Sequence, residues 1–385
     1  MFPGDLYSSR RMHLYDSFIF NLYLERFYYF LDRDVQIINL FSVKPISTHP
    51  LNRIQSFQEE ETIQRLKEFL ELGEDYKILI LPDQFSAYYL LFFSALDLND
   101  EVMTPAPIPY FLKQYTHSLS VRLIHIETSS INDYELPLRG NIEDLITART
   151  KLFYYSEPNF SGGITYSEES LERILFLCRN YHLYIGVDET LSHLIREPEN
   201  FVQMHNISLE NERLIRINSL LKDFSMDDVT VMMFHTALPQ RIELIARDLF
   251  PVSPYQLASL VYFLDNARDI LADRINEMNQ KRSIIQNFID NREDISSFYF
   301  RGIGSVFIKL PIPNSESFVE WLLCDYDRDK KTVFVAPSVH FHSDDYEDEG
   351  EILIDYRYLN PEMLEEGLEI LQDALDQYLG LKKED

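Results

Sequence analysis

Residues 151–163 read KLFYYSEPNFSGG, an apolar run that passes into a polar turn with two glycines. Residues 183–190, LYIGVDET, and residues 214–222, LIRINSLLK, repeat this arrangement. Short apolar runs bounded by turn residues are typical of strands that are buried on both faces of a sheet. We therefore expect three strands whose carboxyl ends carry polar groups. Those polar residues are Asn159, Asp188 and Lys222.

The chain around these runs alternates between strand-like and helix-like patterns. Seven apolar runs predict strands, at residues 35–40, 77–81, 121–126, 151–155, 182–187, 214–217 and 229–234. Amphipathic segments predict helices at residues 59–72, 86–96, 168–179 and 238–249. This alternation predicts an α/β fold with a mostly parallel, seven-stranded sheet that is covered by helices on both faces.

The pattern changes after residue 250. Ser253 and Pro254 form the N-cap and first-position pair of a helix that should run to about residue 287. Strand patterns follow at 304–310, 332–336 and 352–358, with helix patterns at 315–323 and 362–379. We expect four segments: an N-terminal helical arm (1–34), a large α/β domain (35–252), an interdomain helix (253–287) and a small C-terminal α+β domain (288–385).

Charge and cysteine content limit the possible partners and compartment. The chain has 385 residues, with 35 Lys and Arg against 63 Asp and Glu, so its formal net charge is −28. Such an acidic surface repels nucleic-acid phosphates and anionic lipid headgroups. The two cysteines, Cys178 and Cys324, lie in apolar contexts that are typical of reduced thiols. We expect a cytoplasmic protein that binds neither nucleic acid nor a membrane.

The three strand ends carry the groups that a pyridoxal phosphate site needs. Ligands of open α/β sheets bind outside the carboxyl ends of the strands, where these residues should meet. The cofactor requires an amine for a Schiff base, a carboxylate for its pyridine nitrogen and a donor for its ring oxygen. Lys222, Asp188 and Asn159 would fill these roles in that order. Each also has an ordinary interpretation, as a surface lysine, a helix cap and a turn residue.

Several motifs follow one another in a recognisable order. Residues 156–162 read SEPNFSG, Asp188 precedes a glutamate, and residues 219–222 read SLLK. These resemble the N-P-x-N-P-T-G, D-E and S-x-S-K motifs of the class I/II aminotransferase family, the fold-type I pyridoxal phosphate enzymes. The segments 98–107, 304–311 and 333–337 resemble further family segments. The resemblance covers about residues 35–380 and implies a large domain, a smaller α+β domain, pyridoxal 5'-phosphate, an amino substrate and a homodimer.

The resemblance also implies roles for the matched residues. Lys222 would carry the cofactor as a Schiff base, Asp188 would hold the pyridine nitrogen, and Asn159 would contact the ring oxygen. The phosphate would rest on hydroxyl groups and a helix N-terminus. The residues expected there are Ser219, Thr230, Gln84, Phe85 and Ser86. The family has an arginine at the position of Thr230, so we expect this chain to bind the phosphate more weakly.

Two further positions depart from the family pattern. Leu353 stands where the family has the arginine for the substrate α-carboxylate, so Arg357, on the same face of the expected strand, becomes the candidate substrate residue. The aromatic residue that stacks on the pyridine ring aligns with Pro109. Tyr110 beside it is the candidate for that contact.

A histidine pair lies before an acidic segment. His340 and His342 alternate along residues 339–342 and could face either a metal or the substrate. The corresponding loop of the family faces the active site, so we expect substrate contact and no metal site.

Two functions remain open at this stage. The first is a pyridoxal phosphate-dependent, aminotransferase-like enzyme that acts on an amino acid or amine. The second is a pseudoenzyme that keeps the fold for dimerisation or partner binding. Retention of Lys222, Asp188 and Asn159 favours the enzyme, whereas loss of both arginines favours the pseudoenzyme. The substrate and the reaction type, whether transamination, decarboxylation, elimination or oxidation, are not set by the sequence.

Overall fold

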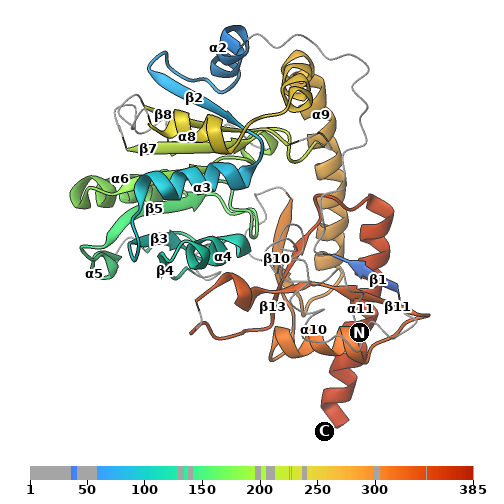
Figure 1. The fold of residues 1–385 in the computed structure, drawn as a ribbon. Helices are drawn as coiled ribbons and strands as arrows, with labels where there is room; N and C mark the ends of the chain where they lie inside the picture. The colour runs from blue at the N-terminus through green and yellow to red at the C-terminus, as the bar shows by residue number, and fades with distance from the viewer. Residues whose placement is uncertain are drawn as a thin grey trace, which may run out of the picture.

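A computed structural model gives the fold of the chain (Figure 1). It describes residues 36–40, 59–128, 134–137, 142–195, 201–204, 213–224, 226, 228–235, 241–297, 304–343 and 345–384. The expected N-terminal arm, residues 1–34, lies outside these described residues. No helix in the described part has the length and apolar character needed to cross a membrane.

The large sheet has seven strands, as predicted, in the order β2-β8-β7-β6-β5-β3-β4. Their bounds are β2 Tyr76–Leu81, β3 Glu101–Pro105, β4 Arg122–Ile126, β5 Thr150–Ser156, β6 Tyr184–Asp188, β7 Leu214–Ser219 and β8 Thr230–His235. Strand β8 runs antiparallel to β2 and β7, and every other pairing is parallel. The expected α/β fold with a mostly parallel sheet is therefore confirmed.

One of the seven expected strands lies elsewhere. Residues 35–40 supply β1, Gln36–Asn39, which pairs in parallel with β11, Lys331–Phe334, and not with the large sheet. The seventh strand is instead β3, whose five residues are all buried. An isolated apolar run contains no information about its partner strand, and β3 is short and ends in a proline. The sequence pattern therefore found the number of strands but misplaced one of them.

Helices cover both faces of the large sheet (Figure 1). Helix α3, Gln84–Ala95, contacts β2, β7 and β8 on one face. On the other face, side chains of α2, Glu59–Phe69, join those of β2, β8 and α9 in a second apolar cluster. The remaining helices of this part are α4 Tyr110–Ser118, α5 Ile142–Leu145, α6 Glu168–Tyr181, η4 Ser192–Leu194 and α8 Arg241–Leu249.

Helix α9, Pro254–Asp290, connects the large sheet with the smaller one. Ser253 caps it, and Gln256 completes a capping box, in agreement with the predicted start. Its 37 residues correspond to about 55 Å of helix. One helix therefore reaches past both sheets.

The smaller part is built on a four-stranded sheet of order β12-β13-β10-β9. Its elements are β9 Ser296–Ser297, β10 Ser305–Lys309, α10 Ser315–Cys324, β12 Ala336–Pro337, η6 Ser338–Phe341, β13 Glu351–Asp355 and α11 Pro361–Glu384. The single strand expected at 332–336 is divided between β11 and β12, which belong to different sheets. The strand expected at 352–358 ends at Asp355, so Arg357 lies just beyond it.

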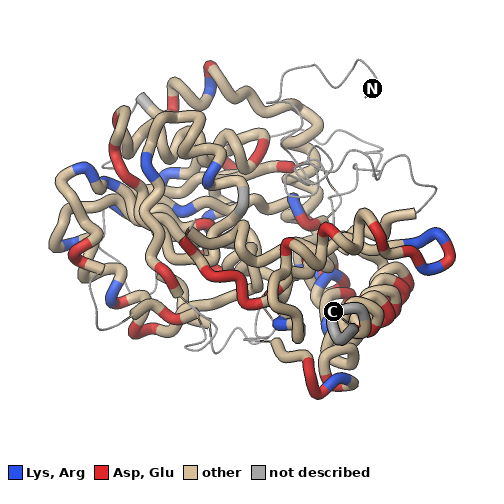
Figure 2. Tube along the Cα trace, turned by 90° about the horizontal axis from the view of Figure 1, so that it is seen from below, with Lys and Arg blue, Asp and Glu red and all other residues tan. Residues whose placement is uncertain are grey.

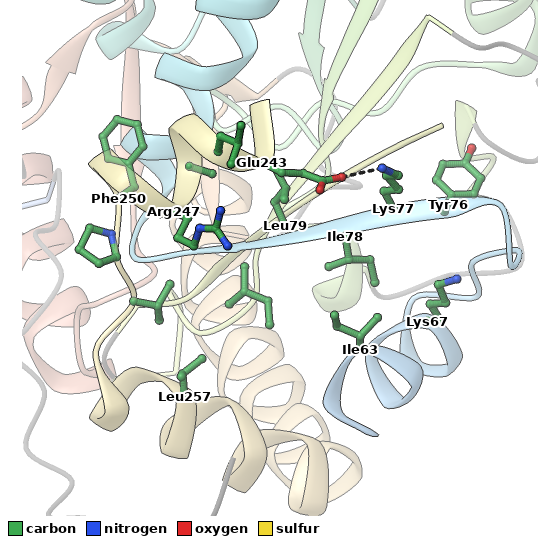
Figure 3. Close-up of a pocket in the computed structure, with 15 residues that line it drawn as sticks. Ile63, Lys67, Tyr76, Lys77, Ile78, Leu79, Glu243, Arg247, Phe250 and Leu257 are labelled. Carbon is green, nitrogen blue, oxygen red and sulfur yellow. Dashed lines mark hydrogen bonds and ion pairs between the residues drawn. The ribbon is translucent and has the colours of Figure 1, made fainter. Parts of the chain in front are cut away.

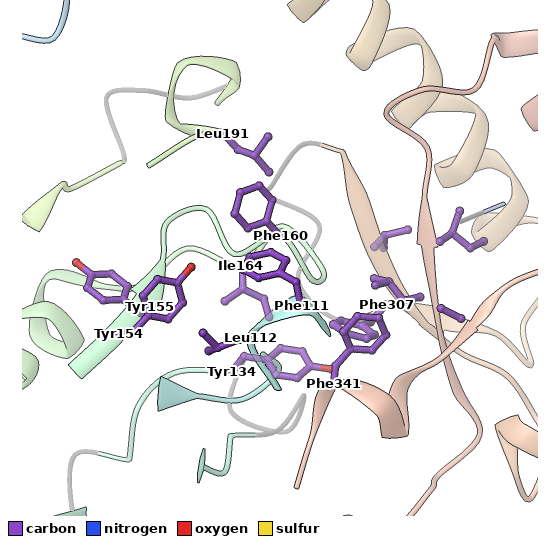
Figure 4. Close-up of a cluster of buried hydrophobic side chains, with 14 of the residues drawn as sticks. Phe111, Leu112, Tyr134, Tyr154, Tyr155, Phe160, Ile164, Leu191, Phe307 and Phe341 are labelled. Carbon is purple, nitrogen blue, oxygen red and sulfur yellow. The ribbon is translucent and has the colours of Figure 1, made fainter. Parts of the chain in front are cut away.

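An aromatic cluster fills the space between the two parts (Figure 4). Phe160 from the loop after β5 contacts Phe111 of α4, and Phe307 of β10 contacts both Tyr134 and Phe341. The strand-end loops are thus supported by an apolar core that the two parts share.

Acidic residues are distributed along the chain in both the large and the small part (Figure 2).

Candidate active site

The expected site residues lie along one edge of the large sheet. Asp188 is the last residue of β6, Ser219 is the last residue of β7, and Thr230 is the first residue of β8. Ser219 lies opposite Thr230 in the sheet register, and Thr230 lies opposite Leu81 at the end of β2. The loop after β5 joins the same edge, because Glu157 donates its backbone N–H to the Asp188 carbonyl at 2.8 Å.

A single amide connects the candidate lysine with the candidate carboxylate. Lys222 Nζ donates to Gln84 Oε1 at 2.5 Å, and Gln84 Nε2 donates to Asp188 Oδ2 at 2.7 Å. Gln84 is the first residue of α3 and is 2% exposed. The amine and the carboxylate therefore face each other across the width of one planar group.

Asp188 is fully buried and accepts several hydrogen bonds. Besides Gln84, Tyr88 donates its hydroxyl to Oδ2, and the Thr190 backbone N–H donates to Oδ1 at 2.9 Å. Burial raises the pKa of the Asp188 carboxyl above its ordinary value, although the hydrogen bonds from Thr190, Tyr88 and Gln84 oppose this rise. Asp188 thus holds a proton more readily than an exposed aspartate does.

The raised pKa of Asp188 predicts a pH-dependent effect of Asp188→Asn. The folded protein binds a proton at Asp188 more tightly than the unfolded chain, so ionisation there costs stability increasingly as pH rises above the ordinary carboxyl range of about 4. Thermal unfolding of the cofactor-free protein should show that the Tm of Asp188→Asn rises relative to the Tm of the wild type between pH 4 and pH 8. A difference in Tm that stays constant over this range would contradict the assignment.

The Lys222 amine lies among aromatic and charged groups. Its Nζ is 5.4 Å from the centre of the Phe160 ring, and the Arg357 guanidinium is 5.7 Å from the same centre. Burial lowers the pKa of Lys222 and the Arg357 charge lowers it further, while nearby carboxylates act in the opposite direction. A lowered pKa increases the fraction of neutral, nucleophilic amine.

Arg357 reaches this site from the end of β13. It forms a two-point ion pair with Asp355, in which Nη2 lies 2.6 Å from Oδ2 and Nε lies 3.0 Å from Oδ1. Its Nη1 lies 3.7 Å from Asp223 Oδ1, too far for a hydrogen bond, and has no hydrogen-bond partner among the described residues. Tyr358 donates its hydroxyl to Asp223 Oδ1 at 2.7 Å. The structure thus brings Arg357 together with Lys222.

Asn159 supports the loop that passes beside Asp188. Its Nδ2 donates to the Pro107 carbonyl at 2.7 Å, and its Oδ1 accepts from the Ser161 backbone N–H at 2.9 Å. Ser305 of β10 holds the same loop, accepting from the Gly162 N–H at 3.0 Å and donating to the Phe160 carbonyl at 2.7 Å. The amide of Asn159 is therefore engaged in loop structure in the cofactor-free protein.

The groups expected to bind the phosphate are mostly engaged with carboxylates. Ser219 Oγ donates to Asp228 Oδ1 at 2.6 Å, and the Ser86 N–H donates to Asp83 Oδ1 at 2.7 Å. Thr230 Oγ1 is buried and has no hydrogen-bond partner among the described residues.

Phe85, a candidate for the phosphate-binding helix N-terminus, is the second residue of α3, and Tyr110, the candidate for stacking on the ring, is the first residue of α4. The Phe85 ring stacks on Tyr115 at 5.5 Å between centres. Tyr110 begins α4 after Pro109 at its N-cap.

The two histidines lie on the small-domain side, at η6. His340 Nε2 lies 3.5 Å from Glu316 Oε1 of α10, and the His342 ring stacks on Tyr346 at 3.8 Å. His342 is fully buried, and its Nδ1 lies 3.4 Å from Glu127 Oε2. These contacts join neither histidine to the Lys222–Asp188 pair.

Several site residues were missed in the sequence. Tyr88 follows Gln84 by one helical turn, so the two share a helix face, and that spacing was the available signal. Asp223 directly follows Lys222, and Asp83 has the residue type and position of a helix N-cap. The side-chain role of Gln84 had no such signal, because only its place at a helix N-terminus was visible.

A groove of about 750 Å³ opens elsewhere on the large domain (Figure 3). Apolar side chains line it together with the basic residues Lys67, Lys77 and Arg247, and Lys77 Nζ lies 2.6 Å from Glu243 Oε1. The residues that line it include none of Lys222, Asp188 or Arg357. The groove is therefore separate from the candidate active site.

Solved structures of aspartate aminotransferases have the same fold as this chain. A structure of a Thermus thermophilus aspartate aminotransferase mutant superimposes with a TM-score of 0.77 at 17% identity, covering 95% of this chain and 99% of that one. The aspartate aminotransferase of Thermotoga maritima gives a TM-score of 0.75 at 18% identity, with 96% and 100% covered. These likenesses confirm the fold-type I architecture.

Sequence comparison gives the family directly. The aspartate aminotransferase of Pyrococcus horikoshii is 24% identical over 330 residues, which cover 82% of this chain and 80% of the relative. The family model for aminotransferase class I and II matches residues 41–289, more than half of the chain. Since the sequence match and the fold agree, the chain belongs to the class I and II aminotransferase family and is a transferase of fold type I.

Proposed function

We propose that this chain is a pyridoxal phosphate-dependent aminotransferase-like enzyme that acts on an amino acid or amine and holds its cofactor through Lys222. The observation that carries the proposal is the bridge from Lys222 through Gln84 to Asp188. It sets a half-buried lysine amine opposite a fully buried carboxylate, with the space of one flat polar group between them.

The residues present fit the ring of the cofactor. An amine at one end and a buried carboxylate at the other match the carbonyl carbon and the pyridine nitrogen of pyridoxal phosphate. The Gln84 amide takes the intervening room and would have to swing aside. The Thr230 hydroxyl, which has no hydrogen-bond partner in the part of the chain that the structure describes, offers one donor to the phosphate.

The chain's own side chains would perform the remaining steps. Bound pyridoxal phosphate supplies an electron sink for the bonds at the substrate α-carbon. Asp188 would keep the pyridine nitrogen protonated, because its buried carboxylate would balance the charge of that nitrogen. Lys222 Nζ, with its lowered pKa, would take and return the substrate proton.

Arg357 is the proposed contact for a substrate carboxylate. Its Nη1 has no hydrogen-bond partner among the described residues, and both Arg357 and Lys222 lie against Phe160. Asp355 orients the guanidinium by its two-point contact, so Nη1 faces Asp223 and the lysine side of the site. An amino acid could therefore place its carboxylate near Arg357 and its amine near Lys222.

Covalent trapping tests the proposal. Purified protein is incubated with pyridoxal phosphate and reduced with borohydride, and its peptides are mapped by mass. We expect one pyridoxyl adduct, on Lys222, and a visible absorption band before reduction. An adduct on another lysine, or none on the native protein, would favour the pseudoenzyme alternative, which the carboxylates near Ser219 and Ser86 also favour.

We also propose that the enzyme works as a homodimer on a small amino substrate in the cytoplasm. The family supports the dimer, and Cys178 and Cys324, which are not joined in a disulfide, are compatible with a reducing compartment. Sedimentation equilibrium should give twice the chain mass of 45.6 kDa.

A further inference from the structure

Three neighbouring strand ends direct side chains to one face of the large sheet. Residues that lie directly opposite each other in an antiparallel pair point to the same side, so Ser219, Thr230 and Leu81 share a face. Leu81 packs in the same apolar cluster as Ala87 and Leu91 of α3. The hydroxyls of Ser219 and Thr230 therefore lie under the N-terminal half of α3.

The first carboxylate beside the Ser219 and Thr230 hydroxyls is that of Asp228. Its Oδ1 accepts the hydroxyl hydrogen of Ser219 at 2.6 Å, nine residues earlier in the chain. The Thr230 hydroxyl, fully buried two residues after Asp228, has no hydrogen-bond partner among the described residues. A buried hydroxyl that no described residue satisfies is available to hydrogen-bond to a ligand oxygen.

The second carboxylate is Asp83, the N-cap of α3. Its Oδ1 accepts from both the Ser86 N–H at 2.7 Å and the Ser86 hydroxyl at 2.8 Å. A helix N-terminus attracts anions through its free N–H groups and its dipole. In this chain an internal carboxylate already occupies that position.

Gln256 holds the two carboxylate-bearing segments next to each other. Its Nε2 donates to the Pro82 carbonyl at 2.7 Å and to the Asp228 carbonyl at 2.8 Å, so these two backbone oxygens lie close together. Pro82 precedes Asp83 directly. Two negative charges are thus fixed beside the hydroxyl and N–H donors that a phosphate would use.

We propose that Asp83 and Asp228 hold these donors in the cofactor-free protein and compete with the cofactor's phosphate, so that this chain exchanges pyridoxal phosphate readily instead of retaining it. The identity of the ligand rests on the proposed function. The competition itself rests on the contacts of Ser219 and Ser86 and on the unpartnered Thr230 hydroxyl. Repulsion by a carboxylate falls with distance, so it should weaken binding of the phosphate more than binding of the ring.

Titration of cofactor-free protein tests the competition, with pyridoxal phosphate and pyridoxal as the two probes. Asp228→Asn keeps an acceptor for Ser219 but removes the charge, so pyridoxal phosphate should bind about tenfold more tightly or better, the size of one charge-assisted hydrogen bond. Binding of pyridoxal, which has the same ring and no phosphate, should change less than about twofold. Absorbance of the bound ring gives both dissociation constants without any turnover.

Asp83→Asn is an independent second variant, because asparagine caps a helix as well as aspartate does. It should tighten pyridoxal phosphate in the same direction, and the double variant more than either. The matched control is Asp248→Asn on α8, an exposed position where the same charge change should leave both affinities unaltered.

Each outcome separates the two proposals. Unchanged or weaker pyridoxal phosphate binding by Asp228→Asn and Asp83→Asn, with an adduct still on Lys222, would overturn the competition and leave the proposed function intact. Equal tightening of pyridoxal would also overturn it. Phosphate-selective tightening without an adduct on Lys222 would support the competition and contradict the role of Lys222. No saturable binding by any form would overturn both.

Discussion

Lys222→Ala should abolish turnover of amino substrates and leave pyridoxal phosphate bound only loosely. The amine is the one group of the site that bonds to the cofactor under the proposed function, and it takes part in proton transfer as well. Removing a positioned proton-transfer group costs about a hundredfold to ten-thousandfold in rate, and loss of the covalent link adds to this. The measurement is single-turnover absorbance with an amino substrate, before and after gel filtration.

Lys281→Met serves as the matched control for this prediction. Lys281 is fully buried, whereas Lys222 is half-buried, and it contacts Glu277 and the Arg357 carbonyl and not Gln84. This variant should lose thermal stability and keep the visible band of the bound cofactor. Retention of the band and of turnover by Lys222→Ala would refute the proposed role of the lysine.

Asp188→Ala should reduce kcat by about a hundredfold or more, because a hydrogen bond to a charged group contributes about 1.5–3 kcal/mol and here it also sustains the electron sink. Under the proposed function, Asn159→Ala would remove a neutral contact to the ring oxygen, worth about 1 kcal/mol, or about fivefold. Steady-state kinetics with saturating cofactor measures both. Equal and small effects would mean that these strand ends do not form the site.

Thermal unfolding has to accompany the Asn159 measurement. The Asn159 side chain bonds to the Pro107 carbonyl and the Ser161 N–H, so its removal also loosens the loop. The kcat effect should therefore come with a fall in Tm for Asn159→Ala, whereas Asp188→Ala should show the larger kcat loss whatever its Tm.

The sequence predicted the parts of this protein that depend on local pattern. The apolar runs predicted at 182–187 and 214–217 became β6 and β7, which end at Asp188 and Ser219, and Ser253 became the cap of α9. These features depend on residues that are neighbours in the chain, where periodicity and capping preferences act.

Contacts between distant segments were not predictable in the same way. Gln84 bonds to Lys222 across 138 positions, and Gln256 reaches Pro82 across 174 positions. Neither residue type indicates its partner, because a glutamine amide can donate to or accept from almost any polar group. The placement of β1 beside β11 was hidden for the same reason.

The contacts of the long helix α9 limit where residues can be inserted into or deleted from this protein. Gln256, near its start, fixes the Pro82 and Asp228 segments, while Arg274 and Lys281 hold the Arg357 carbonyl further along. Inserting or deleting one residue between Gln256 and Arg274 would rotate one set of contacts by about 100° and move it by about 1.5 Å relative to the other. Loops tolerate such insertions and deletions. The part of α9 between Gln256 and Arg274 should not, because its length sets the relative position of two groups of contacts at the candidate active site.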